Sequence, residues 1–118
     1  MQKVMIVGAG TGGSSILKSL METSFFRIGA IADTDGHAEG IRIARDRGLL
    51  HGNNWRDMLD NSYDLIIEAT GSPEVFRELQ QAKGPDTVLI PGTVACIISE
   101  LMNEKENLIA RLRFETER

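Results

Sequence analysis

Three glycines near the start of the chain, Gly8, Gly10 and Gly13, have the spacing G-x-G-x-x-G. In such a loop the first glycine permits a tight turn, and the second lets a pyrophosphate approach the backbone without meeting a Cβ atom. The third glycine lets a helix pack closely on the preceding strand. The expected chemistry is the binding of a phosphate-bridged nucleotide by N–H groups at a helix start, where the helix dipole favours an anion.

The context of the three glycines strengthens this interpretation. A short apolar run over residues 4–7 precedes them and a helical pattern follows them. A second apolar segment, residues 26–32, ends in Asp33, 20 residues after Gly13. An acid at that distance accepts hydrogen bonds from the hydroxyls of an adenosine ribose. The alternative is a glycine-rich turn of a parallel sheet that binds no ligand, and the combined signature favours the nucleotide site.

Strand and helix patterns alternate along the chain. The predicted strands cover residues 3–7, 26–32, 49–51, 64–70 and 87–90. Helices are predicted over residues 12–22, 37–47, a short stretch ending at 59 that Asn53 or Asn54 caps, and a segment from Ser72 and Pro73 to Gly84. Such alternation predicts an α/β fold with a doubly wound parallel sheet, and right-handed crossovers give the order 3-2-1-4-5.

Ligands of such sheets bind where the strand order reverses, between the loops after the first and fourth strands. The candidate cofactor-binding residues are Gly8, Ala9, Gly10, Thr11, Gly12, Gly13, Asp33, Thr34, Thr70, Gly71 and Ser72. Because Asp33 repels a 2′-phosphate and no basic residue directly follows it, NAD is the expected cofactor and NADP is less favoured. The hydroxyl of Thr34 is compatible with either NAD or NADP.

A different pattern begins at residue 94. Apolar positions recur at heptad spacing, with one lysine among them: Val94, Ile98, Leu101, Lys105, Leu108 and Leu112. The chain is therefore divided into a dinucleotide-binding domain, residues 1–93, and a helix continuing into a coiled-coil linker, residues 94–118. We expect residues 94–101 to pack on the sheet. Leu108 and Leu112 lie roughly 20 Å or more beyond the helix start, and the simplest partner is the same helix of a second copy in a homodimer.

Few residues offer acid–base or nucleophilic chemistry. Cys96 is most simply a small buried hydrophobe, and His37 and His51 are most simply surface or edge residues. Glu68, inside the fourth predicted strand, either reaches the cleft or pairs with a backbone donor at the edge of the core. No histidine–cysteine–acid cluster has metal-ligand spacing. We therefore assign no catalytic and no metal-binding residue, and expect no dehydrogenase turnover by these 118 residues alone.

Composition narrows the range of partners. The net charge is −4 and no basic cluster is present, which argues against nucleic acid. Charged residues make up 25% and hydrophobic residues 42%, as in ordinary globular domains. No run approaches the roughly 18 apolar residues of a membrane span, so we expect no membrane contact. A single cysteine and the lack of a signal-peptide pattern fit a cytoplasmic protein.

Several stretches resemble known families. VGAGTGG, IADTD and DLIIEATGSPEV look like the NAD(P)-binding Rossmann domains of the glucose–fructose oxidoreductase and the homoserine or aspartate dehydrogenase type. The oxidoreductases of the first group carry Glu-Lys-Pro after the fifth strand, whose lysine works in catalysis, whereas this chain has Pro91, Gly92 and Thr93. The tail, ISELMNEKENLIARLRFETER, resembles the charged coiled-coil linkers of bacterial sensor histidine kinases and PAS-containing regulators.

Two main hypotheses follow. In the first, the chain is an NAD(H)-binding sensory domain at the front of a longer signal-transduction protein, and its last helix passes on the ligand state. The alternative is the cofactor-binding domain of an NAD(P)-dependent oxidoreductase without its substrate domain. A third reading is a degenerate Rossmann domain used only for dimerisation. The missing catalytic residues and the heptad tail favour the first.

Overall fold

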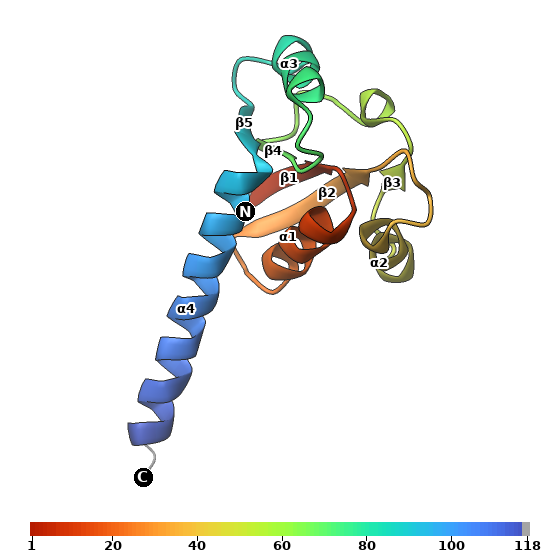
Figure 1. Cartoon of the computed structure of the whole chain (residues 1–118). Helices are drawn as coiled ribbons and strands as arrows, with labels where there is room; N and C mark the ends of the chain where they lie inside the picture. The colour runs from red at the N-terminus through yellow and green to blue at the C-terminus, as the bar shows by residue number, and fades with distance from the viewer. Residues whose placement is uncertain (117–118) are drawn as a thin grey trace.

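The computed structural model describes the backbone of residues 1–116 and the side chains of residues 1–104 and 111. Five parallel strands form one sheet in the order β3-β2-β1-β4-β5, with helices on both faces (Figure 1). The strands are β1 (Gln2–Val7), β2 (Phe26–Ala32), β3 (His51–Gly52), β4 (Leu65–Glu68) and β5 (Val88–Pro91). The helices are α1 (Thr11–Met21), α2 (Glu39–Arg47), α3 (Pro73–Ala82) and α4 (Gly92–Thr116). The predicted fold class and strand order are confirmed.

The central strand β1 is buried on both faces, as expected for a parallel sheet covered on both sides. Val4 and Ile6 pack in a cluster with apolar residues of α1 and α2. Met5 and Val7 face the other way, into a cluster that includes Trp55 and residues of β4 and α3. Burial of all four side chains fixes the strand, and with it the position of the glycine loop that follows.

Two boundaries differ from the prediction because carboxylates take over backbone N–H groups. Helix α2 begins at Glu39, two residues later than expected, since Asp33 accepts from the N–H of Asp35 (2.8 Å) and Asp35 accepts from the N–H of His37 (2.9 Å). These successive turns compete with helix formation. Strand β4 ends at Glu68 rather than at residue 70, because the Glu68 side chain binds the N–H groups of the next turn.

The short elements are smaller than predicted. Strand β3 consists of residues 51–52 instead of 49–51, and the short helix is a single 3₁₀ turn over Trp55–Asp57. Asn54 caps that turn by accepting a hydrogen bond from the N–H of Arg56 at 3.1 Å. At α3 the prediction is confirmed: Ser72 is the N-cap, accepting from the N–H of Val75 at 3.3 Å, and Pro73 is the first helical residue.

Helix α4 begins at Gly92, directly after β5 and two residues earlier than the predicted start at residue 94. Figure 1 shows the helix running away from the sheet, with only its first turns beside α1. Within the described part of the chain, no helix has the length and hydrophobicity needed to span a membrane.

The apolar residues of α4 do not pack as expected. The exposed fractions are 40% for Val94, 37% for Ile98 and 61% for Leu101, whereas Ala95 and Ser99 are buried. The reason is steric: small side chains let α4 approach α1 closely, and β5 sets the direction in which the helix leaves the domain. The prediction that residues 94–101 pack on the sheet therefore holds for Ala95, which joins the core cluster, and is wrong for the apolar seam residues. The side chains of Lys105, Leu108 and Leu112 lie outside the described residues.

Candidate functional site

Two glycines hold the loop between β1 and α1 tightly against its neighbours. Gly8 has a φ of 105°, and a Cβ atom there would lie 2.8 Å from the Thr70 nitrogen and 2.9 Å from the Ala69 carbonyl carbon. A Cβ atom at Gly13 would lie 1.9 Å from the Gly8 carbonyl oxygen. These approaches exclude any side chain, so the loop and the first turn of α1 form one compact unit at the end of β1.

The other two glycines of the loop border open space. Apart from the adjoining residues and the backbone of α1 itself, no described atom lies within 4 Å of a Cβ position built at Gly10 or Gly12. Gly10 is the N-cap of α1 and supplies no side-chain cap, and it is exposed together with Thr11 and Gly12. Backbone N–H groups at an uncapped helix start can bind an anion, which the helix dipole also favours.

Asp33 joins the end of β2 to the glycine loop. Its Oδ2 accepts a hydrogen bond from the Ala9 N–H at 2.7 Å, and its Oδ1 accepts from the Asp35 N–H. The Ala9 carbonyl in turn accepts from the N–H of Gly40, the second residue of α2, at 2.8 Å. Asp33 therefore positions the loop, a role that the sequence did not indicate. Each carboxylate oxygen keeps a second lone pair for a ligand hydroxyl.

A cavity of about 280 Å³ lies beside Asp33. It is lined by Val7, Gly8, Ala32, Asp33, Thr34, Asn53, Trp55, Thr70, Ser72 and Val75. Five of the predicted site residues meet there, from the loops after β1, β2 and β4. Sequence reasoning missed Asn53, Trp55 and Val75. Asn53 was considered only as a helix cap, and Trp55 and Val75 read as ordinary apolar positions of the short helix and of α3.

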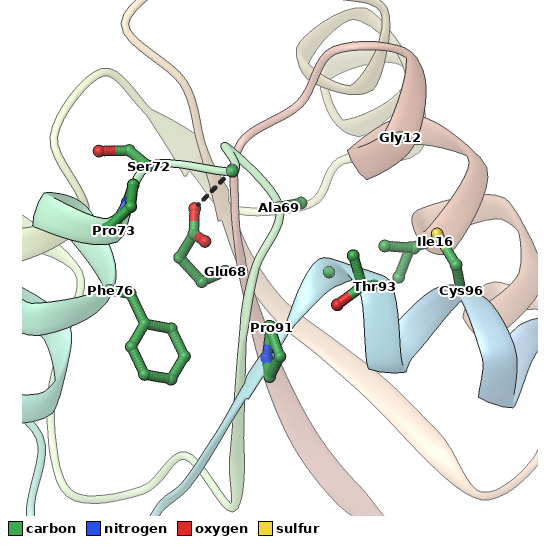
Figure 2. Close-up of a pocket in the computed structure, with 12 residues that line it drawn as sticks. Gly12, Ile16, Glu68, Ala69, Ser72, Pro73, Phe76, Pro91, Thr93 and Cys96 are labelled. Carbon is green, nitrogen blue, oxygen red and sulfur yellow. Dashed lines mark hydrogen bonds between the residues drawn. The ribbon is translucent and has the colours of Figure 1, made fainter.

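A larger cavity, of about 580 Å³, lies between α1, the loop after β4 and the start of α4 (Figure 2). It is lined by Gly12, Ile16, Glu68, Ala69, Gly71, Ser72, Pro73, Phe76, Pro91, Gly92, Thr93 and Cys96. The expectation of a buried Cys96 is wrong, since this residue is exposed and lines the cavity. Helix α4 presents Ala95 and Ser99 to the interior, which leaves Cys96 outside.

The structure brings the predicted site residues together around the glycine loop, in different roles. Ser72 lines both cavities, Gly12 and Gly71 line the larger one, and Gly8, Asp33, Thr34 and Thr70 line the smaller one. The remaining four line neither cavity. Ala9 and Gly13 are buried within the loop, while Gly10 and Thr11 are exposed on it.

Glu68 organises the turn after β4. Its Oε1 accepts hydrogen bonds from the N–H groups of Thr70 (2.7 Å) and Gly71 (3.1 Å) and from the Thr70 hydroxyl. The Thr70 hydroxyl oxygen then accepts from the Ser72 N–H at 3.1 Å. The two roles left open for Glu68, pairing with backbone donors and reaching the cleft, are both present.

The other titratable groups lie away from the cavities. His51 is half-buried on β3, with its Nδ1 2.9 Å from the Leu49 carbonyl oxygen, and His37 is exposed. Glu39 binds Lys18 at 2.8 Å and the Ser14 hydroxyl at 3.2 Å, and these contacts, the lysine first, lower the pKa of its carboxyl. No group of three metal-ligating side chains occurs among the described residues.

Comparison with known proteins finds similarity to two dehydrogenases. No protein-family model matches the chain. It is 27% identical over 89 residues to "Glucose 1-dehydrogenase 1" of Vulcanisaeta moutnovskia (strain 768-28), a match covering 75% of this chain and 25% of that protein. A crystal structure of prephenate dehydrogenase from A. aeolicus, in complex with hydroxyphenyl propionate and NAD+, superimposes with a TM-score of 0.56 and 27% identity.

The fold is Rossmann-like. The structural match covers 77% of this chain and 33% of the prephenate dehydrogenase chain. The chain thus spans a quarter and a third, respectively, of the lengths of the two dehydrogenases. The similarity therefore bears on a part of each dehydrogenase rather than on a whole enzyme.

Proposed function

We propose that residues 1–93 form an NAD-binding domain. The observation that carries the proposal is the arrangement of two cavities, sharing Ser72, beside an uncapped helix start at the glycine loop. The adenosine would occupy the smaller cavity, the pyrophosphate would lie over Gly10–Gly12, and the nicotinamide half would enter the larger cavity. The NAD+ bound to the structurally similar prephenate dehydrogenase supports this assignment.

The residues of each cavity fit the part of NAD assigned to it. In the smaller cavity, Asp33 and Thr34 would bind ribose hydroxyls, while Trp55 and Val75 offer apolar surface to the adenine. In the larger cavity, Ile16, Phe76 and Pro91 supply apolar walls. Cavities that are mostly apolar, with a few well-placed polar groups, are typical of cofactor sites.

We place this domain in an NAD-dependent oxidoreductase, of which it would be the cofactor-binding part. The comparisons support this alternative better than the sensory hypothesis, because both similar proteins are dehydrogenases. No comparison supports a histidine-kinase or PAS-containing parent. One observation favours the sensory role as a second candidate: Gly92, Thr93 and Cys96 of α4 line the larger cavity, and this helix is 25 residues long. Sequencing the adjoining coding region would distinguish the two hypotheses. A substrate domain there would support the oxidoreductase, and a signalling module would support the sensory role.

We predict that NAD+ binds at least about tenfold more tightly than NADP+, a difference of about 1.4 kcal/mol. Asp33 repels a 2′-phosphate, and among the described residues no lysine or arginine lines the smaller cavity. Titration calorimetry with the four nicotinamide dinucleotides tests this. Thr34→Arg changes an exposed position and leaves the hydrogen bonds of Asp33 intact. Because an arginine would attract the 2′-phosphate, this variant should reduce the difference in affinity between NAD+ and NADP+. Tighter binding of NADP+ by the unaltered chain would overturn the assignment.

We further propose that α4 pairs with the same helix of a second copy. Val94, Ile98 and Leu101 are exposed at spacings of four and three residues, which suits a two-stranded coiled coil. We predict that the full chain is a dimer at micromolar concentration. A version ending at Asn103 should be a monomer because it lacks three of the six seam positions, Lys105, Leu108 and Leu112. Sedimentation equilibrium distinguishes these states. If both versions were monomers at high micromolar concentration, the pairing would be rejected.

A further inference from the structure

The larger cavity contains a single ionisable carboxylate. Glu68 is 4% exposed and lines this cavity, and no lysine, arginine or histidine lines it among the residues that the structure describes. Nor does Glu68 belong to either ion pair of the described part of the chain, Lys18–Glu39 and Arg56–Glu78, which both lie outside this cavity. Among the described residues, no cationic side chain therefore lies at the cavity to balance the Glu68 carboxylate.

The hydrogen bonds of Glu68 leave one of its oxygens unused. All three donors, two from Thr70 and one from Gly71, reach Oε1. No described donor reaches Oε2. In the described part of the chain, the only fully buried side-chain polar atom without a hydrogen-bond partner is Ser99 Oγ, so Oε2 is not fully buried. Oε2 therefore keeps contact with open space. Figure 2 shows the carboxylate at the cavity wall, between the turn at Ser72–Pro73 and Pro91.

The rest of the wall determines which cation would fit. Ile16, Phe76 and Pro91 are apolar, so these walls offer a strongly hydrated ion such as an ammonium group little in place of its water. A flat ring with apolar faces and a delocalised positive charge would keep its apolar contacts and balance Glu68. The nicotinamide ring carries one positive charge when oxidised and none when reduced, while its size and its carboxamide group are the same in both forms.

We infer that Glu68 biases the site toward the oxidised cofactor, so that the domain discriminates NAD+ from NADH by charge. This inference rests on the proposed placement of the nicotinamide in the larger cavity. A carboxylate and a cationic ring attract each other more strongly in a partly enclosed, low-dielectric cavity than in water. The neutral reduced ring gains no such attraction, and the carboxamide contributes equally to both forms.

The test is titration calorimetry of the unaltered chain and of Glu68→Gln with NAD+, NADH and ADP-ribose. Glutamine is isosteric and keeps a carbonyl oxygen to accept from Thr70 and Gly71. ADP-ribose lacks the nicotinamide and reports on the remainder of the site. We expect Glu68→Gln to weaken NAD+ binding about tenfold, the size of effect that a partly screened charge pair produces, with NADH and ADP-ribose binding unchanged.

A second variant changes the cavity charge without touching the Glu68 network. Thr93 is exposed and lines the cavity in the first turn of α4, where an acid also suits the helix dipole. Thr93→Asp should raise the ratio of NAD+ to NADH affinity. If ADP-ribose and both cofactors fail to bind the unaltered chain, the proposed function itself is wrong. If they bind and neither variant changes the ratio, or Glu68→Gln weakens NAD+ and NADH equally, the charge inference is overturned while the proposed function stands.

Discussion

Replacing Gly10 by valine is expected to abolish NAD+ binding, with a loss of at least about a hundredfold, or roughly 2.7 kcal/mol. The valine side chain would occupy the open space above the loop that the pyrophosphate needs. The fold should persist, because no described protein atom lies within 4 Å of the Cβ position and the φ of −72° suits any residue. Valine is a poorer helix N-cap than glycine, so we expect a stability loss of about 1 kcal/mol.

Titration calorimetry and circular dichroism together check this result. Gly36→Val is the matched control, since Gly36 also borders open space and lines neither cavity. It should bind NAD+ as the unaltered chain does. An unchanged affinity in a folded Gly10→Val protein would mean that the ligand, if one binds, lies elsewhere.

Replacing Gly13 by alanine is expected to destabilise the protein by about 3 kcal/mol or more, because overpacking a rigid site has this cost. The added Cβ would lie 1.9 Å from the Gly8 carbonyl oxygen and 2.7 Å from its carbon. Both are backbone atoms of a loop that Gly8, Asp33 and Gly40 hold in place. The gain in helix propensity from glycine to alanine, about 1 kcal/mol, is too small to offset the clash.

Urea unfolding followed by circular dichroism measures this loss. Gly12→Ala is the control in the same helical turn, where no described atom outside the adjoining residues and the backbone of α1 lies within 4 Å of the new Cβ. We expect its free energy of unfolding to stay the same or to rise by up to about 1 kcal/mol. Equal stabilities of the two variants would show that α1 does not press on the end of β1 as described.

Periodicity and turn chemistry made much of the fold predictable. The buried run of β1, the glycine spacing and the alternation of strands and helices were sufficient for the strand order. Ser72 and Pro73 marked the start of α3 because a cap and a proline act locally. Local signals also explain the errors: at α2 and β4, side chains of Asp33, Asp35 and Glu68 compete with the backbone in ways that a hydrophobic pattern does not register.

The candidate site was less predictable where it depends on tertiary packing. The heptad pattern marked Val94, Ile98 and Leu101 as a seam, but it could not show that Ala95 and Ser99 would face α1. For that reason Cys96 was misplaced, and the cavity that it lines with Pro91 and Phe76 was not foreseen. Asp33 was chosen for its distance from Gly13, whereas its hydrogen bond to Ala9 becomes visible only when β1 and β2 lie side by side.

The most direct test of NAD binding at the glycine loop is an amide proton–nitrogen NMR titration, which suits a 13.0 kDa chain. We predict that NAD+ shifts the amide signals of Thr11, Gly12 and Gly13 most strongly, together with those of residues 70–72, since these groups lie at the carboxyl edge of the sheet. The absence of any shift at millimolar NAD+, or shifts confined to residues at the opposite edge such as Gln2 and Asp64, would contradict the proposed site.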